Sequence, residues 1–132
     1  MSRFRNRKTA TALSLALAAA GSLLLAAPSA QAGEYLDPCL NSVGGRTSPN
    51  GVWTIPARDF AQGSSGVCVK ELQFDLGSTI GLDPADGPGF VDGLFGPKTD
   101  GYVRRFQRAH GLQADGIVGP QTWQLLVLLT TD

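Results

Sequence analysis

The chain has 132 residues, of which 42% are hydrophobic, and its 11 Lys and Arg residues balance its 11 Asp and Glu residues. Four of the basic residues precede Thr9, so the rest of the chain has seven basic against eleven acidic side chains, a net charge of −4. This acidic balance excludes nucleic acid as an expected partner, because phosphate binding needs a basic surface.

The first 32 residues have the pattern of a secretory signal peptide. A basic start precedes an uncharged stretch from Thr9 to Ala32, and Ala30-Gln31-Ala32 places small residues where a signal peptidase reads the chain. The stretch is about long enough to span a bilayer, but its alanine-rich character and Pro28 favour cleavage over a retained anchor. We therefore expect cleavage after Ala32 and a secreted, extracellular or wall-associated protein that is not held in a membrane.

Residues 33–62 show no helical period and contain three prolines, so the sequence predicts an irregular extension with one short extended piece at residues 52–55. We expect Trp53 to pack on the domain that follows. The alternative is an exposed Trp53 that stacks on a sugar ring.

The chain has two cysteines, Cys39 and Cys68. Export to an oxidising compartment makes a disulfide between them the simplest expectation, and it would tether the extension to the following domain. Two reduced thiols, or a bond between two chains, are the alternatives.

Residues 63–132 are predicted to form three helices joined by turns, an all-α bundle. The first runs from about residue 66 to 77, where Val69, Leu72 and Leu76 share one face. A loop rich in Gly and Pro follows at residues 81–89. The second and third helices open at Pro97 and Pro120, because proline is well tolerated at the first position of a helix.

An internal repeat marks the starts of the last two helices. The tract Asp92-Gly93-Leu94-Phe95-Gly96-Pro97-Lys98-Thr99 recurs as Asp115-Gly116-Ile117-Val118-Gly119-Pro120-Gln121-Thr122. In each copy, Asp-Gly favours a turn with a positive φ at the glycine. The apolar pair that follows, Leu-Phe or Ile-Val, is expected to point inward.

The order of these motifs resembles the peptidoglycan-binding-like domain, a module that bacterial cell-wall hydrolases and other exported proteins carry. The resemblance covers residues 63–129 and includes Val69 to Gln73, both repeat copies, Phe106-Gln107 and Trp123. It implies a three-helix fold and a cell-wall-binding role, usually beside a catalytic domain. The loop from Ile80 to Val91 is longer than the family's usual link, and Tyr102 stands where the family usually has a small residue. The extension replaces the enzyme expected beside the module.

No catalytic group, metal site or cofactor is indicated, so we do not expect an enzyme. The single histidine, His110, falls at a helix C-terminus, where capping is the simpler role. One histidine and a disulfide cannot supply a usual zinc site. Asp92 and Asp115 could be read as the acid and base of a glycosidase, but an aspartate before glycine usually accepts backbone N–H groups in a turn.

Binding chemistry is more plausible. The second helix puts several cations on its outer side, where they could hold carboxylates of a stem peptide, although a charged outer face also serves solubility. Its N-terminus offers free N–H groups, and Phe95 could stack on a sugar, although burial is its simpler role. The predicted ligand-binding residues are Asp92, Gly93, Phe95, Gly96, Lys98, Arg104, Arg105 and Arg108.

Together these features predict an exported, monomeric, non-catalytic protein that binds peptidoglycan. The alternative is a protein-interaction module that docks on or regulates a cell-wall hydrolase. A minimal hydrolase would require catalytic groups that the sequence does not show.

Overall fold

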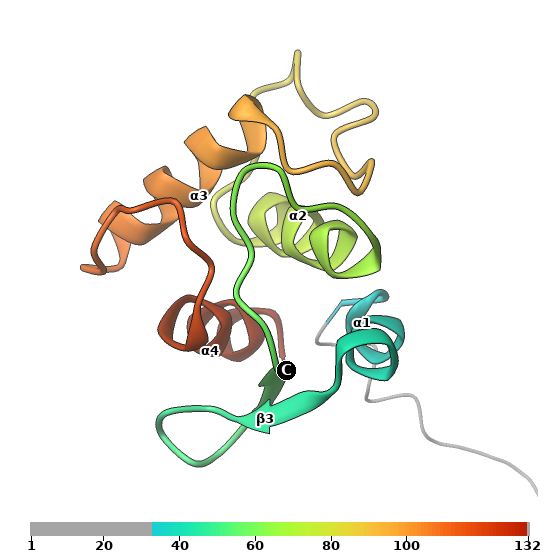
Figure 1. Ribbon diagram of the computed structural model, residues 1–132. Coiled ribbons are helices and arrows are strands. Elements are labelled where there is room, and N and C mark those ends of the chain that lie inside the picture. The colour runs from blue at the N-terminus through green and yellow to red at the C-terminus, as the bar shows by residue number, and fades with distance from the viewer. Residues whose placement is uncertain (1–32, 132) are drawn as a thin grey trace, which may run out of the picture. The chain divides into compact units, whose positions relative to one another are not determined.

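The computed structural model describes residues 33–131, and the predicted signal peptide lies outside them. The described part is largely helical, with four helices and one two-stranded sheet (Figure 1). None of its helices has the length and apolar character needed to cross a bilayer. In chain order the elements are α1 (Leu36–Val43), β3 (Gly45–Thr47), β4 (Thr54–Pro56), α2 (Val67–Thr79), α3 (Pro97–Ala109) and α4 (Pro120–Thr130).

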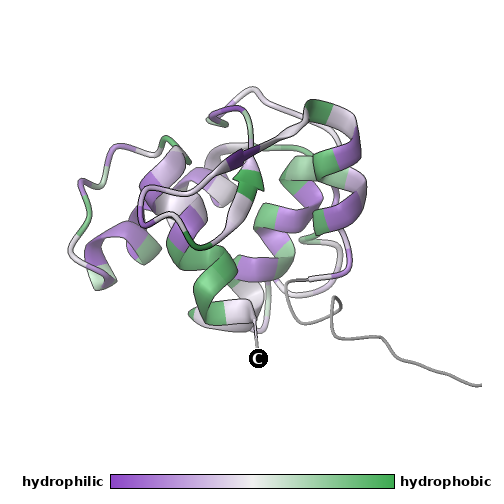
Figure 2. Ribbon diagram, turned by 90° about the horizontal axis from the view of Figure 1, so that it is seen from below, coloured by the Kyte–Doolittle hydropathy of each residue, from purple (hydrophilic) through white to green (hydrophobic). Residues whose placement is uncertain are grey.

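The three predicted helices are confirmed as α2, α3 and α4. Each buries the apolar face expected from its sequence, and α3 and α4 both begin at their proline. Figure 2 shows hydrophobic residues gathered along α4, whose Trp123 and Leu126 are fully buried. The last turn of α4 leaves Leu128 and Leu129 exposed.

The extension was predicted to be irregular, and that prediction is wrong for much of its length. It contains α1 and an antiparallel hairpin, in which Arg46 of β3 lies opposite Ile55 of β4. Pro38 does not prevent α1, because it lies in the first turn, where backbone N–H groups have no partner within the helix. The apolar residues of α1 do follow helical spacing, at Leu36, Cys39, Leu40 and Val43, but the prolines and glycine pairs of the extension favoured an irregular interpretation.

The extension and the three longer helices share one hydrophobic core. Helix α2 packs against α1, α3 and α4, and β4 contacts α1 and α4. The segment between β4 and α2 is also fixed: Phe60 exchanges backbone hydrogen bonds of 3.2 and 2.7 Å with Val118. The ring of Phe60 meets Trp123 edge-on, with centroids 5.9 Å apart. Trp53 is half-buried and packs against this core, as expected.

The Cys39–Cys68 disulfide is confirmed, and it joins α1 to α2. Both half-cystines are buried, and 29 residues separate them in the chain. The bridge therefore closes a loop that includes the hairpin and the segment that contacts Val118.

Reduction of this bridge should lower the thermal stability markedly. On the chain-entropy model, a closed loop of this length contributes about 3 kcal/mol to the free energy of unfolding. We expect the melting temperature to fall by more than about 10 °C in reductant. The Cys39→Ser/Cys68→Ser variant should melt at that lower temperature with or without reductant. Equal melting temperatures for the oxidised and reduced native chain would contradict a stabilising role.

Candidate functional site

A buried glutamine on α2 holds the first Asp-Gly turn. The side-chain amide of Gln73 donates to Asp92 Oδ1 at 2.9 Å, to the Leu94 carbonyl at 3.1 Å and to Thr99 Oγ1 at 3.1 Å. Its oxygen accepts the backbone N–H groups of Asp92 and Gly93 at 3.0 and 2.9 Å. One amide thus links α2, the turn and the first turn of α3.

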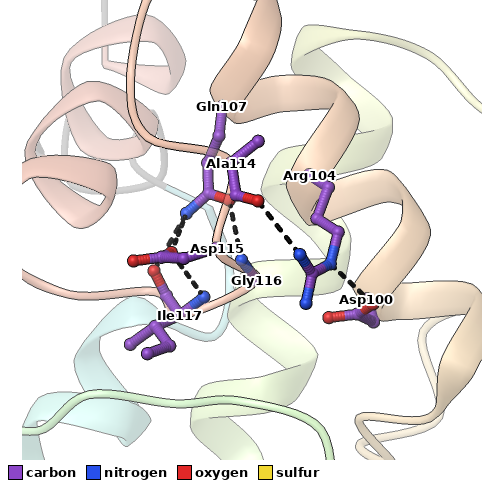
Figure 3. A network of polar contacts seen from close by, with 7 residues as sticks. All are labelled: Asp100, Arg104, Gln107, Ala114, Asp115, Gly116 and Ile117. Atoms are coloured by element: carbon purple, nitrogen blue, oxygen red, sulfur yellow. Dashed lines mark hydrogen bonds and ion pairs between the residues drawn. The ribbon is translucent and has the colours of Figure 1, made fainter.

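The second repeat has the same arrangement around Gln107 of α3 (Figure 3). Its amide nitrogen donates to Asp115 Oδ1 at 3.2 Å and to the Ile117 carbonyl at 2.9 Å. It also donates to Thr122 Oγ1 at 3.2 Å. Its oxygen accepts the N–H of Gly116 at 3.0 Å. Each helix therefore carries the glutamine that fastens the start of the next helix.

The two aspartates form the turns, as the sequence indicated. The Oδ1 atoms of Asp92 and Asp115 accept the N–H groups of Leu94 and Ile117, both at 2.9 Å. The glycine after each aspartate has a positive φ, as predicted, and the hydrogen bond from Gln73 holds the pKa of Asp92 below its usual range.

The apolar pair in each repeat does not point wholly inward, which corrects the prediction. Phe95 and Val118 are buried, whereas Leu94 is 62% exposed and Ile117 is 45% exposed. Successive side chains of an extended segment point to opposite sides, so only one residue of each pair can reach the core. The exposed partners stand at equivalent positions of the two repeats.

Each repeat forms a surface hollow with equivalent walls. The glutamine, the aspartate, the exposed apolar residue and the Gly-Pro start of a helix line both hollows. The first has a volume of about 280 Å³ and the second about 570 Å³. What differs is the chain around them: residues 85–90 border the first, and residues 112–113 with Pro49 and Asp59 border the second.

The long loop brings a carboxylate of the protein itself to the first hollow. Asp86 forms an ion pair with Lys98 at 2.8 Å and accepts the Tyr102 hydroxyl at 2.7 Å. The contact with Lys98 holds the pKa of Asp86 below its usual range. The Tyr102 hydroxyl also accepts the N–H of Asp83 at 3.0 Å, and its ring packs edge-on against Phe90. The cation of the first hollow is therefore already neutralised.

The basic residues predicted to form one ligand surface have separate environments. Arg104 pairs with Asp100 at 2.9 Å and donates to the Ala114 carbonyl at 3.0 Å, so it braces the second turn (Figure 3). Arg105 lies over the Tyr102 ring, 4.7 Å from its centroid. Arg108 is exposed on α3 and forms no ion pair within residues 33–131.

The remaining predicted ligand-binding residues lie in the first turn, before α3 and in the core. Gly93 is buried in the first turn, Gly96 precedes α3, and Phe95 is a core residue with 2% exposure. His110 caps the C-terminus of α3, the position predicted for it. No group of three or more acidic, His or Cys side chains in the described part could hold a metal ion.

Replacing Gln107 by leucine should destabilise the fold by about 2 kcal/mol, because it leaves the buried Gly116 N–H without its acceptor. Urea unfolding measures the change. A suitable control is Gln124→Leu, which removes one exposed hydrogen bond to Asn50 and should cost less than about 0.5 kcal/mol. Equal effects of the two substitutions would contradict the role given to Gln107.

Replacing Asp86 by asparagine should release the long loop without unfolding the core. We expect faster hydrogen exchange of the backbone amides at residues 83–90, because the ion pair with Lys98 is lost. The matched control is Asp83→Asn, since the Asp83 carboxylate is exposed and lies 3.9 Å from Arg105. Unchanged exchange in Asp86→Asn would show that the ion pair does not hold the loop.

Comparison with known proteins agrees with this architecture. Residues 66–126 match the family described as "Putative peptidoglycan binding domain". An "uncharacterized protein in bpoA1 3'region" of Kitasatospora aureofaciens is 41% identical over 88 residues, which cover 64% of this chain and 71% of that protein. The zinc D-Ala-D-Ala carboxypeptidase of Streptomyces albus G is 42% identical over 72 residues, which cover 54% of this chain and 27% of the enzyme.

A crystal structure of a peptidoglycan-binding protein from Clostridioides difficile, in complex with glutamine hydroxamate, is 38% identical with a TM-score of 0.48. That match covers 59% of this chain and 46% of the other. The chain thus spans most of the Kitasatospora protein but about a quarter of the carboxypeptidase. From the match at residues 66–126 and the extent of the Kitasatospora match, the chain belongs to the peptidoglycan-binding domain family.

Proposed function

We propose that this chain is an exported, non-catalytic, monomeric protein of the cell wall that binds peptidoglycan in the hollow of the second repeat. Family membership supports the polymer as ligand, and the relatives include enzymes named as a D-Ala-D-Ala carboxypeptidase and as N-acetylmuramoyl-L-alanine amidases. The observation that carries the choice of site is the difference between two equivalent hollows. In the first, Asp86 of the protein itself pairs with Lys98, whereas the second is about twice as large.

The second hollow has chemistry suited to neutral groups. At the position of Lys98 the second repeat has Gln121, and at the position of Tyr102 it has Leu125. The cation and hydroxyl that hold a carboxylate in the first hollow therefore have no counterparts, and Asp59 adds a negative charge at the rim. A carboxylate would be disfavoured there.

Sugar rings and their N-acetyl groups fit this surface better. Ile117 offers an exposed apolar face to a ring, and Gln113 and Gln121 are exposed amides that can both donate and accept. We therefore place the glycan strand in the second hollow. Among the predicted ligand-binding residues, Arg104 braces the turn beside this hollow through the Ala114 carbonyl. Lys98 and Asp92 line the first hollow.

Ile117→Ser should weaken binding to peptidoglycan by about tenfold, because it removes the apolar contact with a sugar ring. The measurement is co-sedimentation of oxidised residues 33–132 with insoluble peptidoglycan stripped of teichoic acid and protein. Leu94→Ser is the matched control, since it makes the same kind of change at the equivalent exposed position of the first hollow. It should pellet as the native protein does.

Soluble competitors separate the parts of the polymer. Oligomers of N-acetylated sugars should displace the protein, whereas free stem peptides should not. If both serine variants pellet like the native protein, the second hollow is not the site. If the native protein stays in the supernatant, polymer binding is refuted, and docking on a cell-wall hydrolase becomes the reading to pursue.

A further inference from the structure

Helix α2 carries two buried carboxyl groups that the proposed binding site does not use. Glu71 and Asp75 lie one turn apart, and neither has any exposed surface. Glu71 Oε1 accepts the N–H of Tyr35 at 3.1 Å. With both acids ionised, its other oxygen and both oxygens of Asp75 have no hydrogen-bond partner among the described residues, and a proton on Asp75 supplies one hydrogen bond, between the two acids. Buried polar atoms without partners are costly, so this pair is incomplete as it stands.

The residue that lies against this pair is Gly33. It is buried, and a Cβ built on it would stand 2.6 Å from Glu71 Oε1 and 2.8 Å from Glu71 Cδ. These separations are shorter than van der Waals contact, so a side chain at position 33 would collide with the Glu71 carboxyl group, and only glycine fits there. The nitrogen of Gly33 is one bond from that Cα. It is also the atom that cleavage after Ala32 would turn into a chain terminus.

The charged groups around the pair provide no compensation. Glu34 and Asp37 are acidic and act on Glu71 through space. Lys70 directs its ammonium group over the Tyr35 ring, 5.9 Å from the centroid, and the ion pairs formed within residues 33–131 include neither Glu71 nor Asp75. Burial accordingly raises the pKa of Glu71 to about 7, and burial together with Glu71 raises the pKa of Asp75 further.

We propose that the Glu71–Asp75 pair is the receptor for the α-ammonium group of Gly33, so that removal of the leader completes the fold. The inference rests on the proposed export and on cleavage after Ala32. The partner it assigns is a group of the chain itself, made by a signal peptidase.

The chemistry of the step is a peptide-bond hydrolysis. Water supplies a hydroxyl group to the carbonyl carbon of Ala32 and a hydrogen to the nitrogen of Gly33. The new amine takes up a second proton, from solvent or from Glu71, and becomes an ammonium group. Asp75 stays protonated, and its O–H donates a hydrogen bond to Glu71. The Glu71 carboxylate also accepts hydrogen bonds from the Tyr35 N–H and from the ammonium group. One positive charge thus meets one negative charge in a buried site.

The first test compares two forms of the secreted part. One begins at Gly33, and the other begins at Ala32, which replaces the ammonium group at Gly33 by an amide. At pH 7 the form that begins at Gly33 should melt at least about 5 °C higher. Equal melting temperatures would overturn the proposal.

A double-mutant cycle assigns the difference to the carboxyl pair. In the Glu71→Gln background the extra alanine should change the melting temperature by less than about 1 °C, because the acceptor carboxylate is gone. Glu34→Gln removes an exposed acid at the second residue of the cleaved chain, so it is the matched control and should keep most of the difference, since it acts on Glu71 only through space. If Glu71→Gln removes none of the difference, the receptor is not Glu71.

Titration gives a readout that does not need a folded variant. The α-ammonium of Gly33, followed by NMR with a ¹⁵N label, should have a pKa at least about one unit above the ordinary value of about 8. An ordinary value would overturn the proposal.

The two forms should also differ in their dependence on pH. A group whose pKa is raised on folding stabilises the protein at pH values below its pKa in the unfolded state. This contribution is lost as the pH rises through its pKa in the folded state. In the form extended by Ala32 the raised group is Glu71, so its melting temperature should fall between about pH 5 and 8. Asp75 has a raised pKa in both forms and contributes the same pH dependence to each, so the difference between their melting temperatures should grow between about pH 5 and 8 and shrink above about pH 8, where the amine of the Gly33 form titrates. Identical profiles would contradict the assignment.

These results are independent of wall binding. Intact mass of the protein exported from the full chain gives the cleavage position, and a first residue other than Gly33 would refute the proposal. If the cycle shows coupling while the protein fails to pellet with peptidoglycan, the proposed function is refuted and the terminal ion pair stands.

Discussion

The amide side chains of Gln73 and Gln107 are the interaction on which the rest of this fold depends. An Asp-Gly turn and a Gly-Pro helix start have little apolar surface, so packing alone cannot fix them. The glutamines supply what is missing: each satisfies backbone and side-chain groups of a turn that would otherwise be buried without partners. An apolar residue of the same size could fill the space but could not form hydrogen bonds to the backbone of the turn.

The two repeats have equivalent hydrogen bonds around their glutamines, but the segment between glutamine and aspartate differs in length. Gln73 and Asp92 are 19 residues apart, whereas Gln107 and Asp115 are eight apart. The longer link carries Asp86, and the side chain that receives it is Tyr102. The longer loop and Tyr102 are therefore one structural feature, because the tyrosine hydroxyl anchors the loop at Asp83 and Asp86. Its consequence is that the cation of the first hollow is neutralised and that this hollow is smaller than the second.

The sequence was sufficient for the three longer helices, the turns and the disulfide, since each depends on local rules or on a single possible pairing. It was insufficient where the outcome depends on distant contacts. Helix α1 has helical spacing in a segment rich in proline and glycine, and the strands of the hairpin have three residues each; packing of Leu36 and Ile55 into the common core stabilises both. Phe95 could not be told from a sugar-stacking residue by its type alone, but it is buried.

The roles of the glutamines illustrate a signal that was present but incomplete. Gln73 and Gln107 both lie on the motif, but their different distances to the turns hid their equivalence. Lys98 and Arg104 similarly read as one cationic surface, because a helix face shows which residues are neighbours but not which loops reach them. Asp86, in one such loop, forms an ion pair with Lys98. The carbonyl of Ala114, in another, accepts a hydrogen bond from Arg104.

Helix α2 contacts both the first Asp-Gly turn and the N-terminal extension. Gln73 faces the first turn, whereas Cys68, Glu71 and Asp75 face the extension, so one helix holds both. The extension in turn supplies Pro49 and Asp59 to the rim of the second hollow. A charge created at Gly33, as proposed, would act on α2, which packs against α3 and α4, the helices that contribute Gln107 and Pro120 to the proposed binding surface. In a domain of this size, where few contacts are redundant, a completed terminal pair and a well-formed hollow are parts of one cooperative structure.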